Sequence, residues 1–414
     1  MHYLFAAVLV LTSAQRTRID AIVALVMRER HIMGLSLGLA RAGTRLYLRG
    51  YGVLDSANGR RADGESIYAV GSIAKQFTAA LVQQSAGRGR LALDAPVATY
   101  LPQDAGLSNV TVAGLLTQTA GIDPTVDLEN PSPRNPPGTQ WLYANANYAL
   151  LGMLLERVTG TAFDGLLRRN ITAPLGLAST GCMRSPTAQN AASGYAWTEP
   201  NGWSAAPPTP TTIADRTCSA SGMFSNAGDL LVWLEALRSG RVAGPASFAT
   251  MASSALLSSG TPANYGYGFF ISNWYGYRVA QHSGYVDGFS SIDAVVPRDG
   301  TEIVVLTNEH TVDLEPLAKA LLAILDAPLD RNLAAGAGAP QNENPVITVA
   351  LQSILTTPGF AQLGELLALE FIERSRVGDV TYDKYRASFS REQMWVTVGY
   401  RDANQIVTLS LQPI

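Results

Sequence analysis

The sequence is poor in cysteine, histidine and charge, and each shortage narrows the function. Charged residues make up 15% of the 414 residues and the net charge is -3, so no basic surface is available to bind nucleic acid. The two cysteines and four histidines do not stand at metal-ligand spacing, which argues against a metal site. No apolar run is long enough to span a bilayer. These absences favour a globular protein that acts on a small molecule or short peptide. The sequence predicts no particular oligomeric state.

The chain begins with a candidate leader. Tyr3–Leu11 is apolar and is followed by small residues at Thr12–Gln15, which together predict a signal peptide over residues 1–15. A truncated start or a buried segment is the alternative, because no Lys or Arg precedes the apolar run. The leader predicts a secreted or periplasmic protein. In such an oxidising compartment Cys182 and Cys218 can form one disulfide, and two buried thiols are the alternative.

The pattern of apolar residues predicts one sheet that is built from both ends of a domain over residues 16–325. A helix over residues 17–31 precedes strands at Leu35–Leu39 and Arg45–Tyr51, and similar strands recur at Tyr277–Gln281, Phe289–Val296 and Thr301–Leu306. Helical patterns in the interval predict an inserted lobe, with helices at Ile73–Gln84, Tyr148–Val158, Ala162–Arg169 and Ala227–Arg238. A last helix, Leu314–Leu325, is expected to return beside the first. The predicted fold class is α/β of the α+β type, an antiparallel sheet flanked by N- and C-terminal helices.

The remaining residues predict an appendage. Residues 326–346 are rich in Ala, Gly and Pro and predict a linker. Residues 347–414 predict a small α+β domain of unknown role, with a helix around Phe360–Arg374 and strands at Met394–Tyr400 and Gln405–Leu411.

Ser72 and Lys75 form the first candidate catalytic pair. They lie three residues apart at the start of an apolar helix and so share one face, where the free N–H groups of the helix start favour an oxyanion. An N-cap serine and a solvated lysine are the alternative. However, only three of the 30 Lys and Arg residues are lysines. An amine can lose its proton when it is desolvated, whereas a guanidinium cannot, so Lys75 is predicted to accept the proton of Ser72.

Tyr143 and Asn145 form the second candidate pair. Because these residues lie two apart in an extended turn, their side chains can both point into one cleft. Tyr143 is predicted to carry protons once cationic neighbours stabilise its phenolate, and Asn145 is predicted to hold a substrate amide. A packing tyrosine and a turn asparagine are the alternative.

The third element is Gln281–Tyr285, at the end of a predicted strand. His282, Ser283 and Gly284 are candidate substrate-binding residues, and Gly284 is expected to let substrate approach the strand closely. The backbone N–H of Tyr285 could join that of Ser72 in an oxyanion hole. A Ser-His-Asp triad is the weaker alternative, because we expect no Gly-x-Ser-x-Gly elbow around a serine.

These three motifs, S-x-x-K, Y-x-N and H-x-G in that order, resemble the superfamily of class C β-lactamases, D-alanyl-D-alanine carboxypeptidases, D-aminopeptidases and related esterases. The segments between them are also similar, namely Leu115–Gly121, Pro137–Thr139, Tyr148–Gly152 and Pro174–Leu177. The similarity extends over about residues 17–325. It implies a cleft between the sheet and the helical lobe, with no metal or organic cofactor.

The resemblance also implies a role for each motif residue. Ser72 is the acylated nucleophile, Lys75 and Tyr143 transfer protons, Asn145 contacts substrate, and His282 is the residue of the third motif.

Two departures bear on the substrate. His282 stands where typical β-lactamases have lysine, and Gln118 stands where many relatives have histidine. A largely neutral histidine anchors a substrate carboxylate less firmly than lysine does. We therefore expect a serine hydrolase that cleaves a D-alanyl or D-amino acid amide, or a carboxylic ester. A class C-like β-lactamase, a non-hydrolytic penicillin-binding receptor and an interaction protein with a vestigial cleft are the alternatives.

Overall fold

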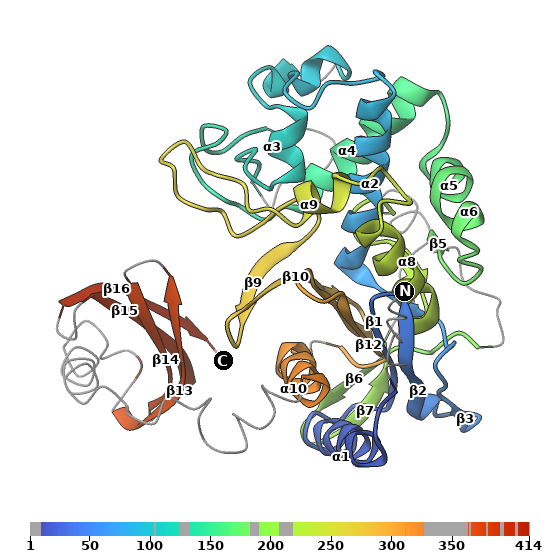
Figure 1. Ribbon diagram of the computed structural model, residues 1–414, viewed down its shortest axis with the longest axis vertical. Helices are drawn as coiled ribbons and strands as arrows, with labels where there is room; N and C mark the ends of the chain where they lie inside the picture. The colour runs from blue at the N-terminus through green and yellow to red at the C-terminus, as the bar shows by residue number, and fades with distance from the viewer. Residues whose placement is uncertain are drawn as a thin grey trace, which may run out of the picture. The chain divides into compact units, whose positions relative to one another are not determined.

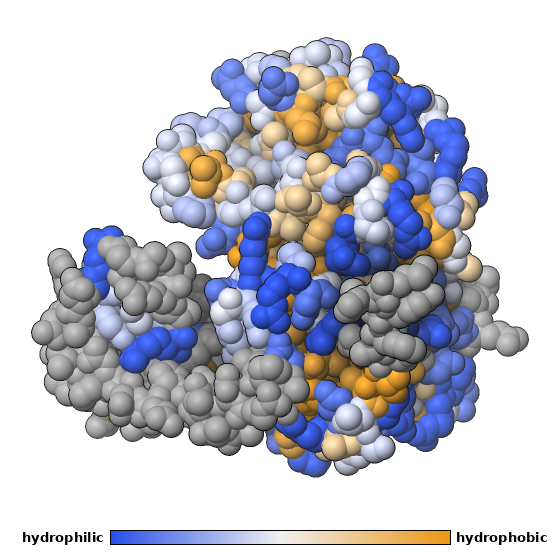
Figure 2. All heavy atoms as spheres, in the orientation of Figure 1, coloured by the Kyte–Doolittle hydropathy of each residue, from blue (hydrophilic) through white to orange (hydrophobic). Residues whose placement is uncertain are grey.

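The structure is a computed structural model, drawn as a ribbon in Figure 1 and as spheres coloured by hydropathy in Figure 2. It describes residues 10–102, 105–123, 132–182, 190–206, 218–310, 312–326, 363, 366–377, 380–389, 393–401 and 405–413. The chain divides into two compact units, of which the larger spans Met1–Ser272 and Tyr277–Leu322 and the smaller includes the chain from Ala323 onward. Apart from Asp326, the predicted linker lies outside the described residues. None of the helices in the described part of the chain is long and apolar enough to cross a membrane.

A seven-stranded sheet forms the centre of the larger unit, in the order β3-β2-β1-β12-β11-β10-β9. The strands are β1 Gly34–Arg41, β2 Thr44–Asp55, β3 Arg60–Arg61, β9 Phe270–Trp274, β10 Tyr277–Val286, β11 Phe289–Val296 and β12 Thr301–Thr307. The two ends of the domain meet where β1 pairs antiparallel with β12, with Leu35 opposite Thr307. All of β12 is buried, because helices cover both faces of the sheet. The prediction of a sheet built from both ends is confirmed.

Helices lie on both sides of this sheet (Figure 1). The first helix, α1 (Ser13–Glu29), and the last, α10 (Glu315–Leu325), lie on one side. On the other side α8 (Ala227–Arg238) packs against β1 and β12. The side chains of Thr12 and Gln15 form the capping box that starts α1. The small residues that suggest a cleavage site therefore form the first turn of α1 in this structure, and cleavage stays a prediction.

The inserted lobe is built around α2 (Ala74–Gly87), most of which is buried. Its other helices are α3 Val112–Leu116, α4 Asn145–Thr159, α5 Phe163–Leu167, α6 Ala173–Leu175 and α9 Ser247–Met251. A small sheet of β4 (Tyr68–Ala69), β8 (Met223–Ser225) and β5 (Gly181–Cys182) adjoins it, and β6 (Tyr195–Thr198) pairs with β7 (Gly202–Ala205). Cys182 and Cys218, which the sequence left open, are joined in a disulfide with their Cα atoms 5.4 Å apart.

From Leu366 onward, the described residues of the smaller unit form an antiparallel sheet in the order β13-β14-β15-β16. The predicted strands are present, as β15 (Gln393–Arg401) and β16 (Gln405–Pro413). The predicted helix is wrong from Leu366 onward, because this segment is β13 (Leu366–Val377) and pairs with β14 (Val380–Phe389). Helix propensity is a weak preference that long-range pairing overrides. Buried Tyr385 and Ala387 alternate with half-buried neighbours along β14.

Asp293 joins the central sheet to α2. Its Oδ1 accepts a 2.6 Å hydrogen bond from Gln76 Nε2, and Gln76 Oε1 accepts one of 3.0 Å from Trp233 Nε1. Burial raises the pKa of Asp293 from 3.8 to about 7. A carboxyl group in this position is therefore more stable when it is neutral.

We predict that Asp293→Asn removes a pH-dependent loss of stability. From pH 3.8 to about 7 the folded chain keeps a proton that the unfolded chain has lost, so the free energy of unfolding of the wild type falls as pH rises through this window and then levels off. Urea unfolding at pH 5 and pH 8 measures it, with exposed Asp94→Asn as control. An equal pH dependence in wild type and Asp293→Asn would contradict the prediction.

Candidate active site

Ser72 lies in a short 3-10 turn, η1 (Gly71–Ile73), that leads directly into α2. Gly71 adopts a left-handed φ of +54°, and a Cβ atom at that position would stand 2.7 Å from the backbone nitrogen of Tyr285. The turn is therefore pressed against β10. This contact brings the backbone of Ser72 close to the backbone N–H of Tyr285, as an oxyanion hole formed by these two groups requires.

Gly284 makes this contact possible from the strand side. A Cβ atom on Gly284 would stand only 2.1 Å from the carbonyl oxygen of Val70. Ser291 Oγ donates a 2.8 Å hydrogen bond to the same oxygen. The expectation that Gly284 makes room for substrate is therefore corrected, because the group that approaches it is the chain just before the nucleophile. The motif also lies inside β10, not at its end.

Lys75 is completely buried beside Ser72. Its Nζ lies 2.9 Å from Ser72 Oγ and donates to Asn145 Oδ1 and to the carbonyl oxygen of Ala220, both at 2.7 Å. Burial lowers the pKa of Lys75 well below its usual value, since removal from water disfavours the ammonium. A neutral amine has two N–H groups, which these two acceptors occupy. Its lone pair then faces the hydroxyl of Ser72.

Tyr143 lies next to both Ser72 and Lys75. Lys75 Nζ is 4.9 Å from the centre of the Tyr143 ring. Burial raises the pKa of Tyr143, and its hydrogen bond with Ser72 offsets only part of this rise. The expectation of a phenolate stabilised by cations is therefore wrong for the resting site: the neighbouring amine is itself driven toward the neutral form, so Tyr143 is a phenol that can donate a proton.

Asn145 is the first residue of α4, and Ala144 before it is extended. This change of conformation lets Tyr143 and Asn145 reach the same place. Asn145 Oδ1 is occupied by Lys75, and its side chain is otherwise exposed. This contact orients the lysine. The amide N–H groups of Asn145 have no hydrogen-bond partner among the described residues.

His282 is buried, and both of its ring nitrogens are satisfied within the protein. Nδ1 lies 2.6 Å from the carbonyl oxygen of Ser283, which can only accept, so Nδ1 is the protonated nitrogen. Nε2 then accepts from the hydroxyl of Tyr265 at 3.0 Å. Burial lowers the pKa of His282 to about 3. The expectation that His282 touches substrate is therefore corrected: it is a neutral residue that holds Tyr265. Ser283 is half-buried, and its contact with substrate stays a prediction.

An aromatic cluster lies beside these groups. The ring of Phe270 is stacked with Tyr143, with centroids 6.1 Å apart, and lies 4.9 Å from both Tyr265 and His282. The Trp141 ring lies 5.9 to 6.2 Å from the rings of Phe270, Tyr265 and Tyr143. This side of the site is therefore apolar and uncharged.

Two functional residues escape sequence analysis. Ala220 contributes only its carbonyl oxygen, which leaves no trace in residue type, and Tyr265 has no motif of its own. The expectation of no Gly-x-Ser-x-Gly pattern is wrong, because Gly34–Gly38 matches it. However, Ser36 is buried inside β1 and donates to the carbonyl oxygen of Asp63. It is not on a strand-to-helix elbow, and a triad built on it is excluded.

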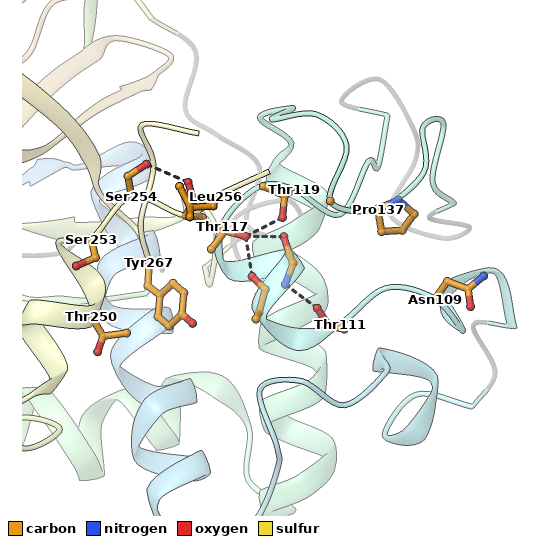
Figure 3. A pocket seen from close by; sticks show the side chains of 14 residues that line it. Asn109, Thr111, Thr117, Thr119, Pro137, Thr250, Ser253, Ser254, Leu256 and Tyr267 are labelled. Carbon is orange, nitrogen blue, oxygen red and sulfur yellow. Dashed lines mark hydrogen bonds between the residues drawn. The ribbon is translucent and has the colours of Figure 1, made fainter. Parts of the chain in front are cut away.

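A separate cavity of about 490 Å³ lies between α3 and the segment after α9 (Figure 3). Its wall includes Thr117, Thr119, Pro137, Ser254 and Tyr267. None of Ser72, Lys75, Tyr143 and Asn145 lines it. The cavity therefore lies apart from the reactive groups, although Thr117 and Thr119 flank Gln118.

The family model of the beta-lactamases matches residues 19–326. These residues hold every group just described. The chain belongs to the beta-lactamase family. Its relatives include proteins named as an esterase, a D-stereospecific amidohydrolase and a D-alanine carboxypeptidase, so membership leaves the substrate open.

Individual relatives illustrate this breadth. The chain is 30% identical to esterase EstB of Burkholderia gladioli over 199 residues, which cover 40% of this chain and 50% of the esterase. It spans about half the length of the first curated relatives it matches. A D-stereospecific amidohydrolase from Streptomyces sp. is 25% identical, with a TM-score of 0.60 over 72% of this chain and 94% of that one. An octameric penicillin-binding protein homologue from Pyrococcus abyssi is 20% identical and shares the fold, with a TM-score of 0.67 over 96% and 98%.

We predict that Gly284→Ala displaces the Ser72 turn. The added methyl group cannot fit against the Val70 carbonyl, so the rate at which a fluorophosphonate labels Ser72 should fall roughly 100-fold, as expected for a displacement of about 1 Å. Gly87→Ala is the matched control, because a methyl group there meets nothing within 4 Å and alanine favours a helix. Unchanged labelling of Gly284→Ala would contradict the close contact.

Proposed function

We propose that the chain hydrolyses an uncharged carboxylic ester, or a short D-amino acid amide, through an acyl-enzyme on Ser72. The observation that carries this proposal is the buried amine of Lys75, whose Nζ lies 2.9 Å from Ser72 Oγ while Asn145 and Ala220 accept hydrogen bonds from it. This is the arrangement of a nucleophile and an adjacent base. Residues 16–325 are the catalytic domain in this proposal, and no cofactor takes part.

In the acylation step Ser72 Oγ attacks the substrate carbonyl carbon while its proton passes to Lys75 Nζ. The backbone N–H groups of Ser72 and Tyr285 stabilise the oxyanion that forms. The phenol of Tyr143 then donates its proton to the leaving alkoxide or amine, and the ammonium of Lys75 returns a proton to the phenolate. Water repeats the sequence on the acyl-enzyme and releases the acid, with Ser72 Oγ as the leaving group.

The charge of the site supports the choice of substrate. Neutral His282 stands at the third motif, and the Phe270 and Trp141 rings line the site beside Tyr143. Among the described residues that contact Ser72, Lys75 and Tyr143, no permanent cation is present to attract a substrate carboxylate. An apolar acyl or alcohol group would instead bury surface against the rings. The similarity to an esterase and to a D-stereospecific amidohydrolase agrees with both substrate classes.

We also propose that the chain is secreted or periplasmic, after removal of residues 1–15. The disulfide between Cys182 and Cys218 supports this location, because disulfides persist in oxidising compartments.

Ser72→Ala tests the nucleophile. Intact-mass analysis after exposure to a fluorophosphonate should show one adduct on the wild type and none on Ser72→Ala, because the alanine lacks the attacking oxygen. Equal labelling of the two would remove Ser72 from the mechanism.

On wild type, p-nitrophenyl butyrate should be hydrolysed faster than p-nitrophenyl succinate, whose added carboxylate finds no cation. The opposite order would contradict the neutral site.

Lys75→Arg tests the base. A guanidinium stays protonated and cannot accept the Ser72 proton, so kcat should fall at least about 1000-fold, whereas Lys319→Arg, on α10, should retain full activity. In the wild type, kcat/KM should fall as pH drops through the lowered pKa of Lys75, because protonation removes the lone pair. Retained turnover in Lys75→Arg would show that the amine is not a proton carrier.

A further inference from the structure

Gln118 is a buried residue that the proposed mechanism does not use. It follows the short helix α3 and adopts a left-handed φ of +61°, which is unusual for a residue with a side chain. It is completely buried. A long polar side chain that is held in this conformation away from water indicates that its position is set by specific contacts.

Two of those contacts are with the residues that flank Tyr143. The backbone N–H of Leu142 donates to the main-chain oxygen of Gln118 at 2.9 Å. The backbone N–H of Ala144 donates to its side-chain oxygen, Oε1, at 3.0 Å. Gln118 therefore holds the chain immediately before and immediately after Tyr143.

The same Oε1 atom also accepts a hydrogen bond from Asn147 Nδ2, in the first turn of α4. Asn145 lies two residues before Asn147, and its own Oδ1 accepts from Lys75. One amide oxygen thus connects the extended segment that carries Tyr143 with the helix start that carries Asn145.

The neighbours of Gln118 hold it in this orientation. Thr117 Oγ1 donates to the carbonyl oxygen of Ala113 at 2.8 Å and lies 2.9 Å from Thr119 Oγ1. Both threonines face the cavity of about 490 Å³, as Figure 3 shows. Because Thr117 and Thr119 are anchored on that side, the Gln118 side chain between them is directed to the opposite side, toward Ala144.

We infer that Gln118 is the positioning residue for Tyr143 and Asn145, and this inference rests on the proposed function. Its two oxygens set where the Tyr143 hydroxyl meets Ser72 and where Asn145 meets the Lys75 amine. Among the described residues, Gln118 itself forms no hydrogen bond with the Tyr143 hydroxyl or with the Asn145 side chain. Its loss should therefore impair acylation of Ser72 and proton transfer, with little effect on how substrate binds.

Two substitutions separate positioning from general stability. Gln118→Met keeps the length of the side chain but offers no oxygen to Ala144 or Asn147. Gln118→Glu keeps an oxygen acceptor at the same place. Gln84→Met is the matched control, because Gln84 also bonds a backbone group, the carbonyl oxygen of Val242 at 2.6 Å, but lies at the far end of α2 from Ser72.

The measurements are the rate at which a fluorophosphonate labels Ser72, together with kcat and KM for p-nitrophenyl butyrate at a temperature where each variant is folded by circular dichroism. We expect kcat and the labelling rate of Gln118→Met to fall roughly 100-fold, with KM within about threefold. Gln118→Glu should recover at least a tenth of wild-type kcat. If its carboxyl group ionises, the negative charge should move the acid limb of kcat/KM to higher pH, because it favours the Lys75 ammonium. Gln84→Met should match the wild type.

Two outcomes would overturn the inference. One is a folded Gln118→Met whose kcat and labelling rate equal those of Gln84→Met. The other is a Gln118→Glu that is no more active than Gln118→Met at a pH above the acid limb of its own kcat/KM profile, which would show that the oxygen contacts do not matter. A wild type that is not labelled would overturn the proposed function and this inference together, whereas labelling of the wild type and Gln118→Met at equal rates would overturn the inference alone.

Discussion

The rest of the site depends on one constraint, the burial of an amine that has no carboxylate beside it among the residues that the structure describes. An ammonium that leaves water loses several kcal/mol of hydration, so Lys75 gives up its proton more readily than an exposed lysine does. The surrounding chain supplies two neutral oxygens, from Asn145 and Ala220, instead of a negative charge. A carboxylate there would favour the ammonium and abolish the base. The neutral acceptors orient the amine and leave its lone pair for Ser72.

The architecture keeps this environment in place from two directions. From the sheet, Gly71 and Gly284 allow the serine turn to lie against β10 at a distance that no side chain would permit. From the lobe, Ala220 is presented by a short segment that follows Cys218, which is tied by its disulfide to β5, and Ser219 accepts from Thr78 of α2 at 2.6 Å. Helix α2, the sheet and the Ala220 segment therefore enclose the lysine on separate sides.

The third motif shows how one substitution changes what a shared fold can recognise. A lysine at position 282 would need water or an anion to stabilise its charge. The histidine is neutral, donates to Ser283, accepts from Tyr265 and packs against Phe270. The position is thereby converted from one that recognises charge to one that supports an aromatic wall. This conversion is compatible with a family whose members include esterases and amidohydrolases.

The sequence by itself determined the order of the motifs, the helix start at which Ser72 and Lys75 lie, and a sheet assembled from both ends of the domain. These follow from local periodicity and spacing, which depend on neighbours along the chain. Tertiary structure decided the rest: that Leu366–Val377 is a strand, that Gly284 accommodates the Val70 carbonyl, that Tyr143 is a phenol and that His282 faces inward. The physical reason is that pairing, close backbone approach and desolvation are set by groups far away in sequence. Such groups leave no local pattern, and a backbone carbonyl such as that of Ala220 has no residue type to reveal it.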